Sequence, residues 1–220
     1  MAGAVSSPDT PWIFGNQPLP QTFALAPILR RLTGLALSLE HDEEGLAQII
    51  EYLASGEQHL NNQAPADPTP RIGPEERPDR RVYLDHGRDI GSFNPCFPEY
   101  EIQVERESAT GSVSFPLAYE GPPGCVHGGF LAVFFDCVIQ HHNCDFGVAG
   151  KTTALSVEYR RPTPLLRSLQ FGIERTSDGS RVTSVADLQL DGKILCQATM
   201  EAVAGDRSRL PEVSARQGRE

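Results

Sequence analysis

The stretch that decides the fold is Gly121-Pro-Pro-Gly-Cys-Val-His127-Gly128-Gly129-Phe-Leu-Ala-Val-Phe-Phe-Asp136-Cys-Val-Ile139. It opens with prolines and glycines, which break regular structure, and no further breaker follows until Gly147. The pattern predicts a loop that leads into a helix. From Phe130 to Ile139 the side chains are apolar on every helical face, so we expect protein to surround this helix. The run is too short to cross a bilayer, which takes about 20 apolar residues.

Asp136 is the only carboxylate between Glu120 and Asp145. An isolated carboxylate is costly to bury as an ion, so it needs a polar partner, faces a cleft or carries a proton. We therefore treat Asp136 as a candidate functional residue. The alternative is a structural aspartate bonded to a backbone or hydroxyl donor.

The chain of 220 residues is acidic, with 19 Lys and Arg against 29 Asp and Glu and a net charge of −10. Such a composition argues against a protein that coats nucleic acid, because that function requires a basic face. A ligand that carries phosphate would need a locally basic entrance to its site.

The five cysteines are an odd number with no C-x-x-C pair, which indicates reduced thiols rather than a disulfide framework. The N-terminal residues MAGAVSSPDTPWIFG lack the cationic start and apolar core of a secretion signal. We therefore expect a cytoplasmic protein without a transmembrane segment.

The first half of the chain divides by composition. Residues 1–24 are rich in Pro, Gly and Ser and predict an arm without its own core. Residues 25–63 have apolar side chains at helical spacing in two runs, 26–39 and 43–60, which predict a helical hairpin. Residues 64–98 carry many prolines and turn residues, and we expect a linker followed by an irregular segment.

The pattern changes at residue 99, and we expect one domain to span residues 99–205. Apolar and polar residues alternate near 100–104 and 113–117, then in four runs after the helix, near 155–159, 169–173, 182–190 and 194–203. Asp178-Gly and Asp191-Gly mark hairpin turns. The order predicts an α+β fold in which an antiparallel sheet of about six strands curls around one long helix. Residues 206–220 resemble a disordered tail.

These motifs resemble the hotdog-fold acyl-CoA thioesterases. The likeness rests on Gly-Pro-Pro-Gly-Cys-Val-His127-Gly128-Gly129, on Asp136 nine positions after the histidine, and on Thr152-Thr-Ala-Leu-Ser-Val-Glu-Tyr159-Arg-Arg-Pro162. It covers about residues 95–205 and is strongest to the thioesterase-superfamily members 4 and 5 and the phenylacetyl-CoA-type enzymes. The resemblance implies a hotdog fold and hydrolysis of acyl-CoA. The N-terminal extension varies within the family, so the resemblance implies little about residues 1–94.

The resemblance also implies roles for individual residues. Gly128 and its neighbours would offer backbone N–H groups to the thioester carbonyl, and Asp136 would be the catalytic carboxylate, as base or as nucleophile. Thr152 would help to hold the attacking water, with Thr153 as the adjacent candidate.

Arginine and histidine side chains complete the candidate set. Arg160 falls where the family contacts coenzyme A, and Arg161 beside it offers the same charge-assisted hydrogen bonds. Alternation along the strand predicts that Thr152 and Arg160 line one surface. His127 is either a general base or a residue that orients the loop through a hydrogen bond.

Helix geometry predicts a shared site. Gly128 and Asp136 lie ~12 Å apart along a helix that rises ~1.5 Å per residue. Because proton transfer needs contact at about 3 Å, one substrate carbon cannot reach both groups of one subunit. We therefore expect a homodimer, or a dimer of dimers, that combines Gly128 of one chain with Asp136 of another.

Two other functions stay open. One is a hotdog hydratase or dehydratase, although Ser92-Phe-Asn94-Pro95 keeps only the Asn-Pro of that motif. The other is a protein that binds acyl-CoA without catalysis. We expect no cofactor, and no metal either, because Cys137, His141 and Cys144 share a helical face but lie in apolar surroundings without a second ligand pair.

Overall fold

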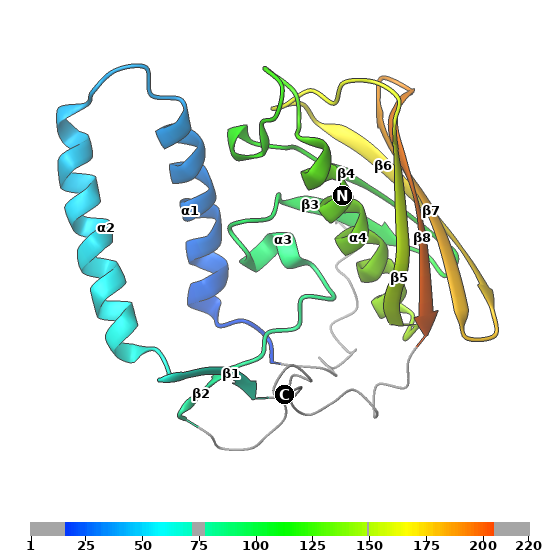
Figure 1. Cartoon of the computed structure of the whole chain (residues 1–220), viewed down its shortest axis with the longest axis horizontal. Coiled ribbons are helices and arrows are strands. Elements are labelled where there is room, and N and C mark those ends of the chain that lie inside the picture. The colour runs from blue at the N-terminus through cyan, green and yellow to red at the C-terminus, as the bar shows by residue number, and fades with distance from the viewer. Residues whose placement is uncertain (1–15, 72–77, 149, 205–220) are drawn as a thin grey trace, which may run out of the picture.

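Six antiparallel strands form the main sheet of the computed structural model, which describes residues 16–71, 78–148 and 150–204. In spatial order they are β3 (Tyr100–Val104), β4 (Ser108–Val113), β6 (Leu169–Asp178), β7 (Arg181–Leu190), β8 (Lys193–Ala204) and β5 (Gly150–Tyr159). Helix α4 (Gly128–Asp145) lies against one face of this sheet (Figure 1). The predicted antiparallel sheet around one long helix is confirmed. Most of the predicted arm and the whole predicted tail lie outside the described residues.

Tight turns join the strands that follow α4. Asp191 and Gly192, between β7 and β8, have φ angles of 51° and 73°, the left-handed pair that a two-residue hairpin requires. Gly179, between β6 and β7, has φ 60°. Both turns stand where the Asp-Gly dipeptides predicted them, and each joins neighbouring antiparallel strands.

The second strand lies earlier in the chain than predicted. Instead of spanning 113–117, β4 ends at Val113, and Leu117 opens the short 3-10 helix η1 (Leu117–Tyr119). The inward residue Gly111 has no room for a side chain, because an added Cβ would lie 2.3 Å from the ring of Phe171 on β6. The strand alternates small inward residues, Ala109 and Gly111, with polar ones, and Val113 at its end is its largest apolar side chain.

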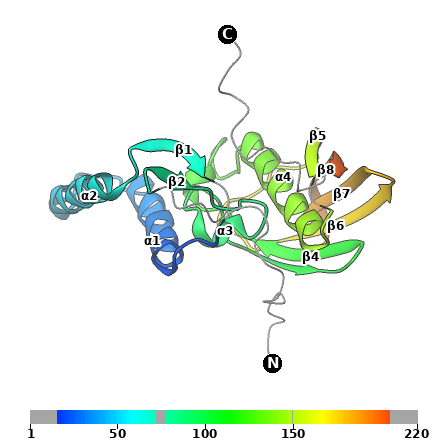
Figure 2. The same ribbon diagram turned by 90° about the horizontal axis from the view of Figure 1, so that it is seen from below.

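Helix α4 supplies the centre of the core but is not covered on all sides. Phe134, Phe135, Val138 and Ile139 are completely buried, and Figure 2 shows the sheet curving around the helix. Val133, however, is 52% exposed. The expectation that protein surrounds the helix is wrong for a single chain, because one apolar face of α4 is open.

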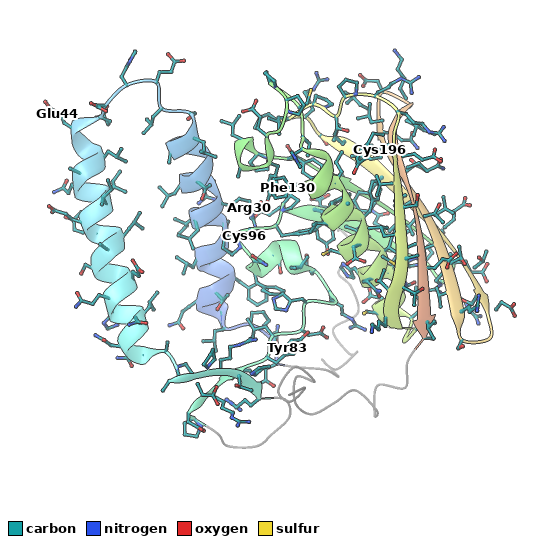
Figure 3. The ribbon with its side chains drawn as sticks, viewed as in Figure 1. Arg30, Glu44, Tyr83, Cys96, Phe130 and Cys196 are labelled. Carbon is teal, nitrogen blue, oxygen red and sulfur yellow. The ribbon has the colours of Figure 1, made fainter. Side chains whose placement is uncertain are left out.

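An extension precedes this domain. Helix α1 (Pro20–Leu37) begins inside the predicted arm and docks through Arg30, which is buried. The Arg30 guanidinium donates to the carbonyls of Gly91, Asn94 and Phe97, at 2.6, 3.0 and 2.8 Å, and pairs with Glu99 at 2.7 Å. Figure 3 shows this side chain reaching from α1 toward the segment that carries Cys96. One arginine thus ties α1 to the segment before β3.

Helix α2 (Glu44–Gln63) stands apart. It has no buried residue, and the side chains of Ile49, Ile50 and Leu53 on its apolar face are exposed. The two predicted helices exist, but they do not pack closely against one another as a hairpin would (Figure 1).

The segment predicted to be an irregular linker contains three short elements. Strands β1 (Asp67–Arg71) and β2 (Arg80–Val82) pair in parallel. Helix α3 (Ile90–Phe93) packs against α1. Pro68 and Pro70 alternate along β1, so both missing N–H groups fall on the same edge of the strand. The count of prolines was therefore misleading, because their spacing permits a strand. No helix in the described ranges is long and apolar enough to span a membrane.

A matched pair of isoleucines tests this packing. Ile139→Ala, in the core, should lower the free energy of unfolding by about 2–5 kcal/mol because it leaves a cavity. Ile50→Ala, on α2, should change it by less than about 0.5 kcal/mol because that side chain is 58% exposed. Urea denaturation of both variants measures the difference. An equal loss for Ile50→Ala would mean that α2 is covered in solution.

Candidate active site

The N-terminus of α4 leaves one backbone donor free. His127 caps the helix, and its Nδ1 atom accepts a hydrogen bond from the Gly129 N–H at 3.0 Å. The N–H groups of Phe130 and Leu131 bond to the His127 carbonyl. The Gly128 N–H is left without a partner among the described residues. Of the predicted group of neighbouring donors, only Gly128 is therefore available to a ligand.

His127 makes the hydrogen bond that the second of its two predicted roles requires. Its side chain is exposed, and Nδ1 is occupied as the helix cap. The hydrogen bond orients the loop from Gly121 into the helix, which a histidine at a cap position can do when Nδ1 is unprotonated.

Tyr159 fixes the peptide that follows the free donor. Its hydroxyl donates to the Gly128 carbonyl at 2.8 Å, so the end of β5 is tied to the start of α4. A Cβ at Gly128 would lie 3.1 Å from the Tyr159 ring. Glycine at 128 therefore allows the close approach of the tyrosine and keeps the N–H uncovered.

Asp136 has a polar partner from the sheet. The Thr152 hydroxyl donates to Asp136 Oδ1 at 3.0 Å, while Oδ2 has no partner among the described residues and is not sealed from solvent. Asp136 is half-buried on the open side of α4. One carboxylate oxygen is thus held in place, and the other is free to act on a ligand.

A β-bulge brings Thr152 to the helix. The pairing of β5 with β8 shifts register between Thr152 and Ala154, so Thr153 is an extra residue and its hydroxyl bonds to the Glu201 carbonyl at 3.1 Å. The geometry thus joins Thr152, not Thr153, to Asp136. The predicted shared surface of Thr152 and Arg160 is wrong, because the bulge resets the alternation and puts Thr152 on the helix side with Leu155 and Val157.

Gln140 belongs to this cluster, and sequence reasoning missed it. Its Nε2 atom donates to Thr152 Oγ1 at 2.8 Å and approaches the Gly150 carbonyl at 3.4 Å. Gln140 lies four residues after Asp136, so one turn of helix puts both side chains on one face. That four-residue spacing indicates a shared face and could have identified Gln140 as a candidate. It is a weak signal, because a polar residue near the end of a helix is usually exposed to solvent.

Burial keeps two titratable groups of α4 uncharged at neutral pH. Burial, with a smaller effect of the Asp136 charge, raises the pKa of the Cys137 thiol to about 12. Burial lowers the pKa of His141 to about 4, and its Nδ1 pairs with the Tyr100 hydroxyl at 2.8 Å. Cys137 is therefore no thiolate nucleophile, because only the deprotonated form attacks.

The two candidate phosphate-binding arginines are exposed at the end of β5, next to Tyr159 and so to the start of α4. Arg160 contacts Glu158 at 3.1 Å and Gln197 at 2.8 Å, and Arg161 donates to the Ile194 carbonyl at 2.6 Å. Both arginines follow Tyr159 in the chain, and Arg160 is on the face of the sheet away from the helix, with Glu158 and Gln197.

Two alternative sites receive no support from the geometry. The Asn94 side chain accepts a hydrogen bond from the Cys96 N–H at 2.9 Å in a turn, and the Asn94 backbone carbonyl accepts one from Arg30. The Asn-Pro segment therefore has a structural use. Among the residues that the structure describes, no group of three or more His, Cys, Asp or Glu could hold a metal ion. Two hollows in the chain lie elsewhere, one between Phe146 and Arg175 and one under α1.

Comparison with solved structures finds similar chains. The thioesterase superfamily protein RHA08564 is 28% identical, with a TM-score of 0.68 over 86% of this chain and 93% of that one. A hypothetical thioesterase protein of Streptococcus pneumoniae TIGR4, solved with coenzyme A, is 23% identical, with a TM-score of 0.46 over 50% of this chain and 91% of its own. A Streptococcus mutans UA159 protein bound to acetyl-CoA is 17% identical, with the same TM-score and coverage. No family model and no curated protein match the sequence.

The thiols provide a direct test of these surroundings. Iodoacetamide at pH 8 should alkylate Cys96, which is exposed, while Cys137 and Cys196, each with a pKa raised to about 12 by burial, should react at least about 100-fold more slowly. Peptide mass spectrometry of the folded protein measures each rate, and the denatured protein serves as the control. Rapid labelling of Cys137 would show that this thiol is accessible and ionised.

Proposed function

This chain has the hotdog fold of the thioesterase superfamily, and we propose that it hydrolyses acyl-CoA thioesters in a site shared between two subunits. One observation carries the proposal. A helix N-terminus with a free N–H, at Gly128, and a carboxylate with a free oxygen, at Asp136, lie on the same helix. The likeness to RHA08564 over most of both chains supports the reaction class.

The two groups suit the two needs of thioester hydrolysis. Negative charge develops on the carbonyl oxygen during attack, and the Gly128 N–H at the positive end of the α4 dipole would stabilise it. Asp136 Oδ2 would take a proton from water, or attack the carbonyl carbon itself. In the first case Thr152 would accept the second proton of the same water in a hydrogen bond. Electrostatic stabilisation and base catalysis thus act on one carbonyl.

A second subunit would bring the groups together. Gly128 and Asp136 stand eight residues apart on α4, or ~12 Å along its axis. Val133 leaves an open apolar face between them, and β5 is an edge strand with one side unpaired. Exposed strand edges and apolar faces are usually covered in stable proteins. A partner subunit related by a two-fold axis beside α4 and β5 would cover both at once. Gly128 of one subunit would then approach Asp136 of its partner.

Coenzyme A would enter near the end of β5. Its phosphates need a local positive charge because the chain carries −10 overall. Arg160 and Arg161 supply that charge beside the Gly128 end of α4. Their present partners, Glu158, Gln197 and a carbonyl, lie at the surface, so the guanidinium groups can exchange them for phosphate oxygens.

Subunit mixing tests the shared site. Asp136→Asn removes the base, and Gly128→Val covers the N–H, so each protein alone should be inactive on acyl-CoA. Each mixed dimer keeps one intact site, so random exchange should restore about a quarter of the wild-type turnover. Release of free thiol from a panel of acyl-CoAs measures it. No recovery after demonstrated exchange contradicts the shared site, and turnover by Asp136→Asn alone contradicts the catalytic carboxylate.

The phosphate contact has a separate test. Arg160→Glu should raise the KM for acyl-CoA by about five- to tenfold with little change in kcat, because it affects a part of the substrate remote from the reacting carbon. Arg181→Glu, with the same charge change at the start of β7, is the matched control. Equal KM values for the two variants would remove Arg160 from the binding site.

A further inference from the structure

Three side chains, of Gln140, Thr152 and Asp136, form a directed chain of hydrogen bonds. We propose that Gln140 is a positioning residue that, through Thr152, sets the orientation of Asp136. Gln140 Nε2 donates to Thr152 Oγ1 at 2.8 Å, and Thr152 Oγ1 donates to Asp136 Oδ1 at 3.0 Å. The inference rests on the proposed hydrolysis only for its effect on turnover.

The direction of the chain follows from the donors available. A carbonyl oxygen can only accept, so the approach of the Gln140 amide to the Gly150 carbonyl, at 3.4 Å, places Nε2 rather than Oε1 on the side of Thr152. Thr152 therefore receives a hydrogen bond from Gln140. Its own single proton must go to another acceptor.

Two acceptors compete for that proton. Asp136 Oδ1 lies at 3.0 Å, and the Met200 sulfur lies at 3.9 Å. A carboxylate accepts much more strongly than a thioether, so the proton goes to Asp136. Because Gln140 presents Nε2, a donor, it excludes the opposite arrangement, in which the hydroxyl donates to Gln140 and leaves the carboxylate without a donor.

The consequence for the site is a fixed carboxylate. Held at Oδ1, Asp136 presents Oδ2 to the open side of α4 in one orientation. Thr152 keeps an unused lone pair, which can accept a proton of the attacking water. Gln140 Nε2 is directed at Thr152 Oγ1 and the Gly150 carbonyl and reaches Asp136 only through Thr152, so its contribution is to orientation.

Replacement of the amide should affect turnover more than binding. Gln140→Met keeps the length of the side chain but removes both N–H donors, and should lower kcat by about tenfold, the effect of one lost hydrogen bond, with little change in KM. Gln140→Glu should lower kcat further, because its carboxylate would accept the Thr152 proton and compete with Asp136. Gln170→Met, an exposed glutamine on β6, is the matched control and should leave both parameters unchanged.

A double-mutant cycle separates positioning from general packing. Thr152→Val removes the intermediate group, so the addition of Gln140→Met to Thr152→Val should cause no further loss of kcat. Additive losses would overturn the proposal, because Gln140 would then act independently of Thr152. Circular dichroism of each variant confirms that it is folded.

An activity-independent measurement keeps the inference distinct from the proposed hydrolysis. In ¹⁵N–¹H NMR spectra, the side-chain amide signals of Gln140 should move in Thr152→Val, and those of Gln170 should not. The same signals should also move in Asp136→Asn, since the threonine proton then faces a weaker acceptor. Unchanged Gln140 signals in Thr152→Val would overturn the proposed chain of hydrogen bonds. Shifted Gln140 signals in a protein without thioesterase turnover would support the chain of hydrogen bonds and contradict the proposed hydrolysis of acyl-CoA.

Discussion

The rise of one α-helix governs how this protein can work. Helix α4 holds a carboxylate at Asp136 and, at Gly128, an N–H with no partner in the described part of the chain. The helix keeps the two groups ~12 Å apart because its backbone hydrogen bonds permit no compression. No rotamer of Asp136 spans that distance. A reaction that uses both groups therefore requires a second copy of the helix, and the open apolar face around Val133 lies where a second copy would pack.

The surroundings of Asp136 show how a carboxylate can be held without being neutralised. No cation pairs with it among the described residues; a hydroxyl on β5 donates to one oxygen, and an amide one helical turn away orients that hydroxyl. An arginine partner would have offered stronger binding but would have occupied both oxygens. The neutral donors leave Oδ2 available, which a base or a nucleophile requires.

The N-terminal extension obeys a different constraint. Buried Arg30 donates to the carbonyls of Gly91, Asn94 and Phe97, so α1 is anchored to the segment before β3. Helix α2 has no such anchor. Its apolar face is as exposed as the open face of α4, and helices of this length usually gain most of their stability from packing.

The sequence by itself determined the order of the main elements after residue 99, the hairpin turns and the candidate Asp136, while Gly128 and Thr152 became candidates through the family resemblance. Local chemistry was sufficient for the first three: breakers before an apolar run, Asp-Gly dipeptides at the turns, and a lone acid in apolar surroundings. Strand β4 was predicted too late in the chain because Ala109 and Gly111 give it a weak apolar pattern, and the space at Gly111 is taken by the Phe171 ring and the Glu101 carbonyl of neighbouring strands. Likewise only the tertiary structure decided which threonine meets Asp136. The bulge at Thr153 depends on pairing with β8, and it moves Thr152 to the face opposite the one that alternation predicts. Gln140 became visible for the same reason: its partners lie on β5, and contacts across the sequence are decided by packing rather than by local pattern.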